Sequence, residues 1–197
     1  MLGIRWRKIL RDIWGNKTRS VLVILSIAIG VFAVGTILSS QAVMMRELRG
    51  NYRSINPSGA WISCDAFDAE FASIIERMPQ VGEAEGRAQA NVRVQTGPNQ
   101  WRSMQLYAPA DYDAIRVDVI HPLSGDWPPK KREMLIERSA MGLLKIDIGD
   151  TVVIETPDGR LHELRIGGVV HDLNQFPSNL SLVGLGYVTL DTMEWLG

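Results

Sequence analysis

The three histidines of this chain, His121, His162 and His171, are the side chains that would matter most if the protein were an enzyme. His171 precedes Asp172, and a carboxylate can orient an imidazole as a general base. However, no serine or cysteine nucleophile stands in a recognisable motif, and no two histidines have the spacing of a helical metal site. His162 lies beside a predicted hairpin turn, where a solvated strand face is the simpler interpretation. The sequence therefore predicts no catalytic residue, no metal ligand and no cofactor.

The remaining polar motifs also favour structural roles. No G-x-x-x-x-G-K-[ST] sequence is present, so the chain is not expected to bind ATP through a P-loop. Glu83 and Glu85 would lie solvated on one face of a strand, and residues 130–132, Lys-Lys-Arg after two prolines, predict an exposed loop. Cys64 is the only cysteine, which excludes a disulfide framework. We expect it to be a small buried apolar residue, as free cysteines usually are.

A long uncharged run dominates the first part of the chain. No charged residue occurs between Arg19 and Arg46. About 20 apolar residues cross the hydrocarbon core of a bilayer, and a run that is apolar on every face needs protein or lipid around it. The run exceeds the hydrophobic region of a signal peptide, although Ser40-Gln41-Ala42 could pass for a cleavage site. We expect a retained transmembrane helix with a stalk over residues 18–53.

The charge distribution predicts the orientation of that helix. Residues 1–53 hold nine Lys/Arg and two acids, whereas residues 54–197 hold twelve Lys/Arg and twenty acids. Six of the cations precede the apolar run. By the positive-inside rule, the N-terminus is cytoplasmic and the residues after about 43 are extracytoplasmic, in a plasma (inner) membrane. Because the first cations are interspersed with Trp, Ile and Leu, the predicted partner is a lipid bilayer and not nucleic acid.

Two sets of residues are predicted to contact the membrane or another helix. Residues 1–15 carry a helical apolar stripe and a basic opposite face, which predicts an amphipathic helix in the cytoplasmic interface; a basic topology signal without helical order is the alternative. The interface residues are Trp6, Trp14, Arg5, Lys8 and Arg11. Small residues at i, i+4 spacing allow helices to approach closely, although they are common in membrane helices generally. Those predicted to pack are Ser26, Gly30, Gly35 and Ser39.

Residues 57–197 predict an α+β domain with mixed strands. Helical periodicity runs from Phe67 to Met78, ahead of Pro79. Alternation and turn residues predict hairpins and strands, namely a strand over 60–64, a hairpin over 92–108, a strand over 134–137, a short helix near 139–144, a hairpin over 150–170 with a bulge at Gly167-Gly168, and a strand over 186–190. Asp191 to Glu194 has capping-box form at the end of the chain. It predicts a further helix and suggests that the domain is incomplete.

The run NKTRSVLVILSIAIGVFAVG, after its basic segment, resembles the start of FtsX/MacB-type permeases of ABC transporters. MLIERSAMGLLKIDIGDTVVIETPDGRLHELRIGGVVHD and GYVTLDTMEWLG resemble their extracytoplasmic core domain, including Gly149-Asp150 and the Gly168-Val169-Val170 strand. The resemblance implies a first membrane helix, a large domain outside, three later spans and a coupling segment that meets a separate ATPase. It implies no catalytic residue in this chain.

The sequence thus predicts a permease subunit of an ABC transporter of the exporter or extractor type. It would relay motion from a partner ABC ATPase to the extracytoplasmic domain, and would pair with a second permease copy as a homo- or heterodimer. A single-pass anchored binding or sensory module that acts without an ATPase is the alternative. A membrane-anchored hydrolase that uses His171 is a third.

Overall fold

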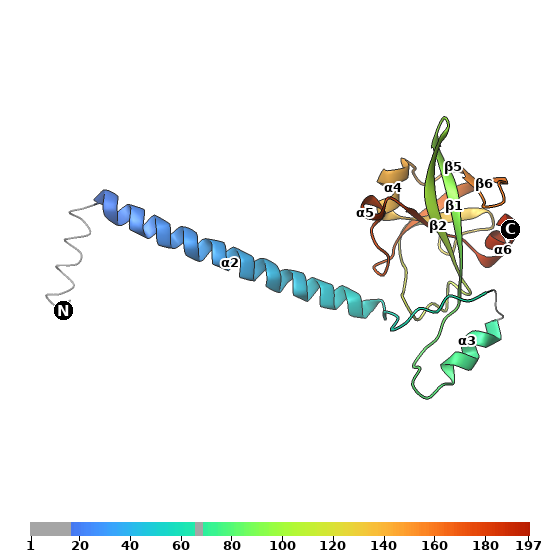
Figure 1. The fold of residues 1–197 in the computed structure, drawn as a ribbon, viewed down its shortest axis with the longest axis horizontal. Helices are drawn as coiled ribbons and strands as arrows, with labels where there is room; N and C mark the ends of the chain where they lie inside the picture. Colours follow the sequence, from blue (N-terminus) through green and yellow to red (C-terminus); the bar gives the residue numbers. More distant parts are fainter. Residues whose placement is uncertain (1–16, 66–68) are drawn as a thin grey trace. The chain divides into compact units, whose positions relative to one another are not determined.

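The computed structural model of this chain describes residues 17–65 and 69–197. The chain divides into two compact units, Met1–Gly50 and Asn51–Gly197. The first contains most of one long helix, and the second is a domain of strands and short helices (Figure 1). The interfacial helix predicted for residues 1–15 lies outside the described residues.

Helix α2 runs without a break from Lys17 to Ser54. Its segment Lys17–Arg46 is long and apolar enough to cross a membrane by length and composition, and none of its most apolar part is buried. Each side chain from Val21 to Arg46 is exposed. Such a helix is unfavourable in water, because its apolar surface points in every direction.

The domain is a mixed six-strand barrel with short helices. Its elements, in chain order, are α3 (Ala69–Glu76), β1 (Arg87–Gly97), β2 (Gln100–Pro109), β3 (His121–Gly125), β4 (Glu133–Glu137), α4 (Arg138–Leu144), β5 (Thr151–Glu155), β6 (Leu161–His171), α5 (Ser178–Ser181), β7 (Gly184–Tyr187) and α6 (Leu190–Leu196). The ring runs β6-β4-β7-β2-β1-β5 and closes because β5 pairs with β6 as well as β1. Strand β3 pairs with β6 outside the ring. Strands β4 and β6 are parallel, as are β2 and β7, and the other pairs are antiparallel. The α+β class is confirmed.

Both predicted hairpins form. Strands β1 and β2 pair antiparallel and extend beyond the predicted 92–108, and the β1–β2 hairpin is the long one in Figure 1. Strands β5 and β6 pair antiparallel across a turn in which Gly159 has a φ of +81°. The predicted bulge is confirmed, because Met134 pairs with Ile166 and Leu135 pairs with Gly168, which leaves Gly167 unpaired.

Three local predictions were wrong. Residues 60–64 form no strand, and nothing in the described chain pairs with their backbone. Strand β7 ends at Tyr187, so the predicted 186–190 strand is displaced towards the N-terminus. The cap of α6 is Thr189, whose hydroxyl accepts a hydrogen bond from the Thr192 amide at 3.2 Å, and not Asp191. A hydroxyl at the last extended residue caps a helix as well as a carboxylate does.

The main apolar core contains the inward side chains of the strands together with Ala140, Leu144 and Leu196 from α4 and α6. Strand β7 reads Gly-Leu-Gly-Tyr, and a Cβ on Gly186 would lie 2.5 Å from the Met134 sulfur. Small residues on one strand therefore make room for large ones on its neighbours, as small barrels require.

A second apolar cluster covers the other face of β4 and β7, where Leu135 and Tyr187 meet Tyr112 and Ile120. Asp172 lies at this cluster, with 3% of its surface exposed. Its carboxylate accepts a hydrogen bond from the Tyr187 hydroxyl at 2.6 Å. Burial raises the pKa of the Asp172 carboxyl, although the hydrogen bond from Tyr187 acts in the opposite direction.

Gly168 and Gly142 form a matched pair for testing the contact of β3 with β6. A Cβ at Gly168 would lie 2.7 Å from the Ser124 carbonyl oxygen, whereas a Cβ at Gly142 in α4 meets nothing within 4 Å. We expect Gly168→Ala to lower the free energy of unfolding by about 1–3 kcal/mol, since backbone cannot move aside. Gly142→Ala should raise it by about 0.5–1 kcal/mol, because alanine favours a helix. Chemical denaturation measures both, and equal effects would contradict the close contact.

Asp172 also predicts a pH dependence. Because its folded pKa is raised, the folded state binds more protons than the unfolded state between the ordinary pKa of 3.8 and the raised value. Its contribution to stability therefore falls as pH rises through that window. We expect Asp172→Asn to gain stability relative to the parent protein as the pH is raised from acid to neutral.

Asp158→Asn provides the control of opposite sign. Hydrogen bonds from Thr156 and Arg160 lower the pKa of Asp158 to about 2. The parent protein therefore gains stability from Asp158 as pH rises through acid values, and the Asp158→Asn variant should lack this gain. Denaturation midpoints measured across pH check both variants, and a flat difference between Asp172→Asn and the parent protein would contradict the buried carboxyl.

Candidate functional site

The predicted membrane residues are only partly covered by the described chain. Ser26, Gly30, Gly35 and Ser39 all lie exposed along α2. A Cβ on Gly30 or Gly35 would meet nothing within 4 Å. Their packing against another helix stays a prediction. The interface residues Trp6, Trp14, Arg5, Lys8 and Arg11 lie outside the described residues.

The histidines do not assemble a reactive site. The Nδ1 atom of His171 lies 3.2 Å from Glu137 Oε1, and the carboxylate of Asp172 is bonded to Tyr187 instead. His162 is not solvated as expected, because its ring packs edge-to-face on Trp195 at 4.6 Å. Within the described ranges, no group of three His, Cys, Asp or Glu side chains could hold a metal ion.

The basic loop at 130–132 is exposed, as expected. Lys130 Nζ bonds to Asp126 Oδ2 at 2.6 Å. The Arg132 guanidinium lies over the Trp195 ring, 4.7 Å from its centroid. These cations therefore engage the domain's own side chains.

The most elaborate polar arrangement lies where the chain leaves α2 and enters the domain. Ile55, the residue after α2, is completely buried. Its carbonyl accepts a hydrogen bond from the Val119 amide at 2.8 Å, and the Asn56 carbonyl accepts one from the Asp118 amide at 3.0 Å. The Ser58 amide donates to Asp118 Oδ1 at 2.9 Å. We call residues 55–58 with 116–119 the helix exit.

Two residues in left-handed backbone conformation shape the helix exit. Asn56 has a φ of +46° and Asp118 a φ of +49°. Asn and Asp tolerate this region better than other non-glycine residues, because their short side chains bond locally. The side-chain amide of Asn56 donates hydrogen bonds to the Arg116 carbonyl at 2.9 Å and to Glu83 Oε2 at 2.8 Å. Backbone and side chain of Asn56 are therefore both fixed.

An ion pair connects the helix exit to the barrel. Arg87, the first residue of β1, bonds to Glu85 at 3.2 Å, and its side chain is 7% exposed. Its guanidinium also donates to the carbonyls of Val117 and Asp118. Glu85 Oε2 in turn accepts bonds from the amides of Arg116 and Val117 at 3.1 and 3.2 Å. Glu85 was expected to be solvated, but these bonds keep it partly buried.

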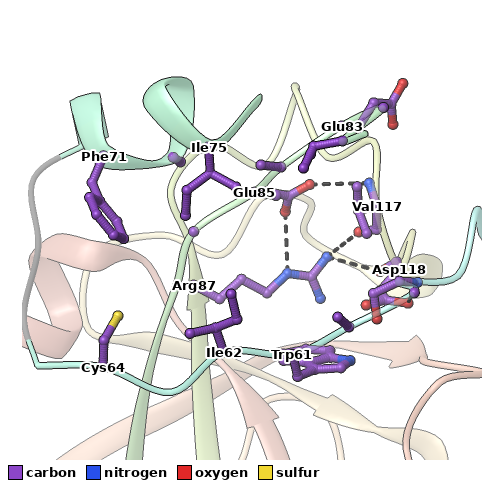
Figure 2. Close-up of a pocket in the computed structure, with 18 of the residues that line it drawn as sticks. Trp61, Ile62, Cys64, Phe71, Ile75, Glu83, Glu85, Arg87, Val117 and Asp118 are labelled. Carbon is purple, nitrogen blue, oxygen red and sulfur yellow. Dashed lines mark hydrogen bonds and ion pairs between the residues drawn. The ribbon is translucent and has the colours of Figure 1, made fainter. Parts of the chain in front are cut away.

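A pocket of about 480 Å³ opens beside this ion pair. In Figure 2, Phe71 and Ile75 of α3 lie on one side of it, and Ile62 and Trp61 lie opposite. Cys64 also lines the pocket and is exposed, so its predicted burial was wrong. The physical reason is that residues 60–64 join no sheet and are therefore not carried into a core.

Sequence reasoning missed the helix exit and the pocket. Their residues come from segments at 55–64, 71–87 and 116–119, which no spacing rule connects. Glu83 and Glu85 were expected only as solvated residues, and the sequence indicated no role for Asn56 or Arg87. Isolated charges without a motif give no signal of a long-range ion pair.

Burial of Ile55 predicts a measurable cost on truncation. We expect Ile55→Ala to lower the free energy of unfolding of the domain by about 2–5 kcal/mol, as is usual for a buried isoleucine. Ile62→Ala removes the same atoms from a side chain that is 73% exposed, and should change stability by less than about 0.5 kcal/mol. Denaturation of the full chain measures both. A similar effect of the two variants would contradict the anchoring role of Ile55.

No protein-family model and no curated protein matches this chain. Among solved structures, it is similar to the extracellular domain of the noncanonic ABC-type transporter YknZ from Gram-positive bacteria. The TM-score is 0.44 at 12% identity, over 71% of this chain and 72% of that one. It is also similar to the periplasmic region of MacB from Actinobacillus actinomycetemcomitans, with a TM-score of 0.41 at 13% identity, over 71% of this chain and 64% of that one. The chain thus matches in structure the extracytoplasmic domains of two FtsX-like ABC transporters.

Proposed function

We propose that this chain is the membrane-spanning permease part of an ABC transporter of the exporter or extractor type. Residues 1–15 would lie in the cytoplasmic interface, residues 18–53 would span the membrane and continue as a stalk, and residues 57–197 would form the extracytoplasmic domain. The helix would receive motion from a partner ATPase and relay it to the domain. The observation that supports this proposal is the continuous apolar helix that precedes the domain along the chain.

A relay needs a stiff element. Helix α2 is continuous from Lys17 to Ser54, and a helix resists bending because each turn is hydrogen bonded to the next. Within the domain unit, Ile55 is buried and Asn56 is hydrogen bonded. The residues that follow α2 are therefore held against the segment at 116–119, and that segment is bonded to Arg87 of β1.

The proposal places ATP hydrolysis on a separate subunit, so this chain itself would be non-catalytic. The partners would be the bilayer, an ABC ATPase and a second permease copy. Close helix approach at Ser26, Gly30, Gly35 and Ser39 would serve contacts between spans. The excess of cations before the apolar run supports a cytoplasmic N-terminus.

Co-purification of the full-length gene product from native membranes tests the proposal. We expect an ATPase subunit with a P-loop to accompany it, and we expect ATP turnover of the complex to fall when a flexible Gly-Ser pair is inserted between Ser54 and Ile55. The matched control inserts the same pair between Pro157 and Asp158, in the β5–β6 turn. Labelling of Cys64 in intact cells by a membrane-impermeant maleimide should report an extracytoplasmic domain.

Two results would overturn the proposal. One is the absence of any ATPase subunit together with a reading frame that ends at the codon for Gly197, which would favour the anchored binding or sensory module. The other is labelling of Cys64 only after the membrane is broken, which would place the domain in the cytoplasm.

A further inference from the structure

The proposed function assigns no role to the pocket beside the helix exit. Its volume of about 480 Å³ falls in the range of roughly 300–1,000 Å³ typical of ligand sites. Apolar side chains form facing walls, Phe71 and Ile75 from α3 and Trp61 and Ile62 from the preceding segment (Figure 2). Trp61 and Phe71 remain 54% and 42% exposed. The walls therefore offer apolar surface that the described parts of the chain leave partly uncovered.

One hydroxyl in the pocket is buried without a partner. The Ser58 Oγ atom is shielded from water, and no other atom of residues 17–65 or 69–197 bonds to it. The Ser58 amide, in contrast, is bonded to Asp118. Leaving a buried hydroxyl unpaired costs free energy, but the Ser58 Oγ atom is closed to a ligand as it is to water.

The charges around the pocket are unbalanced. Its charged lining residues are the acids Glu83, Glu85 and Asp118 and a single base, Arg87. The nearby base Arg116 is paired with Glu76 at 2.9 Å. Arg87 lies between Glu85 and the backbone of Val117 and Asp118, as the dashed lines in Figure 2 show. The remaining negative charge favours a cationic ligand and disfavours an anionic one.

We propose that this pocket binds the apolar tail of an amphiphile whose head group is an amine. The tail packs between α3 and the Trp61 segment, and the ammonium lies beside the pocket carboxylates, of which Glu83 is exposed. The inference rests on the proposed function and deepens it, because it names the chemical class that the transporter recognises outside the membrane. Since the pocket shares Ser58 and Asp118 with the helix exit, an occupant lies directly against the relay.

Photochemical labelling of the full chain in phosphatidylcholine nanodiscs tests the inference. The probes are dodecylamine and dodecanoic acid, each carrying the same diazirine near the end of the tail. We expect the amine to label segments 58–64 and 71–75 about fivefold more than the acid does, as an exposed charge interaction allows. Mass spectrometry of the peptides locates the adducts.

Matched variants separate the pocket from general adhesion. Ile75→Asn introduces a polar group into the wall and should abolish labelling, whereas Ile74→Asn, on the exposed face of the same helix, should leave it unchanged. Glu83→Gln removes one of the negative charges that line the pocket and keeps an oxygen that can accept the hydrogen bond from Asn56, so the protein should fold, and labelling by the amine should fall.

Several outcomes overturn the inference. These are equal labelling by amine and acid, equal labelling of both isoleucine variants, or pocket labelling no stronger than that of the exposed apolar residues Phe176, Leu180 and Leu182. Labelling of α2 by either probe dissolved in the bilayer reports membrane insertion separately. An unlabelled α2 with a labelled pocket would contradict the proposed function and support the pocket.

Discussion

The guanidinium of Arg87 connects parts of the domain that the fold otherwise leaves separate. Arg87 is the first residue of β1. Its guanidinium pairs with Glu85 and donates hydrogen bonds to the carbonyls of Val117 and Asp118. Those residues in turn belong to the segment that holds the first residues after α2. A charge-assisted bond in a site that excludes water is stronger than one on the surface. The residues that follow α2 are therefore connected to β1 by one mostly buried ion pair and its backbone bonds.

Arg87 of this ion pair belongs to a strand of the closed barrel. Six strands close into a ring, so each strand of the ring has two neighbours, and α4 and α6 fill the core from outside the sheet. A tightly packed interior transmits displacement without absorbing it. The exposed apolar helix has the opposite character, because its apolar side chains face outwards in every direction and favour apolar surroundings. The domain therefore requires close packing of its interior, whereas the apolar helix requires apolar surroundings.

The pocket and the helix exit have residues of the domain in common. The pocket is lined by Asp118 and Ser58 of the helix exit, by Arg87 of the barrel, and by apolar side chains of α3 and the segment before it. None of these elements is specialised for binding. Within residues 17–65 and 69–197, their combination leaves the Ser58 hydroxyl without a hydrogen-bond partner and gives the pocket an excess of acidic groups. Such buried unpaired groups are few in native structures.

The sequence alone determined the features that depend on local periodicity. The uncharged run gave a single long helix, alternation gave the β1–β2 and β5–β6 hairpins, and Gly167 gave the bulge, because each follows from neighbours along the chain. Only the tertiary structure decided that Cys64 is exposed, that Thr189 caps α6 and that His162 packs on Trp195. It also decided that Ile55 and Arg87 meet the segment at 116–119. The contacts of Arg87 and Ser58 with that segment join residues 30 and 60 positions apart, and no local pattern records which distant backbone will complete a hydrogen bond.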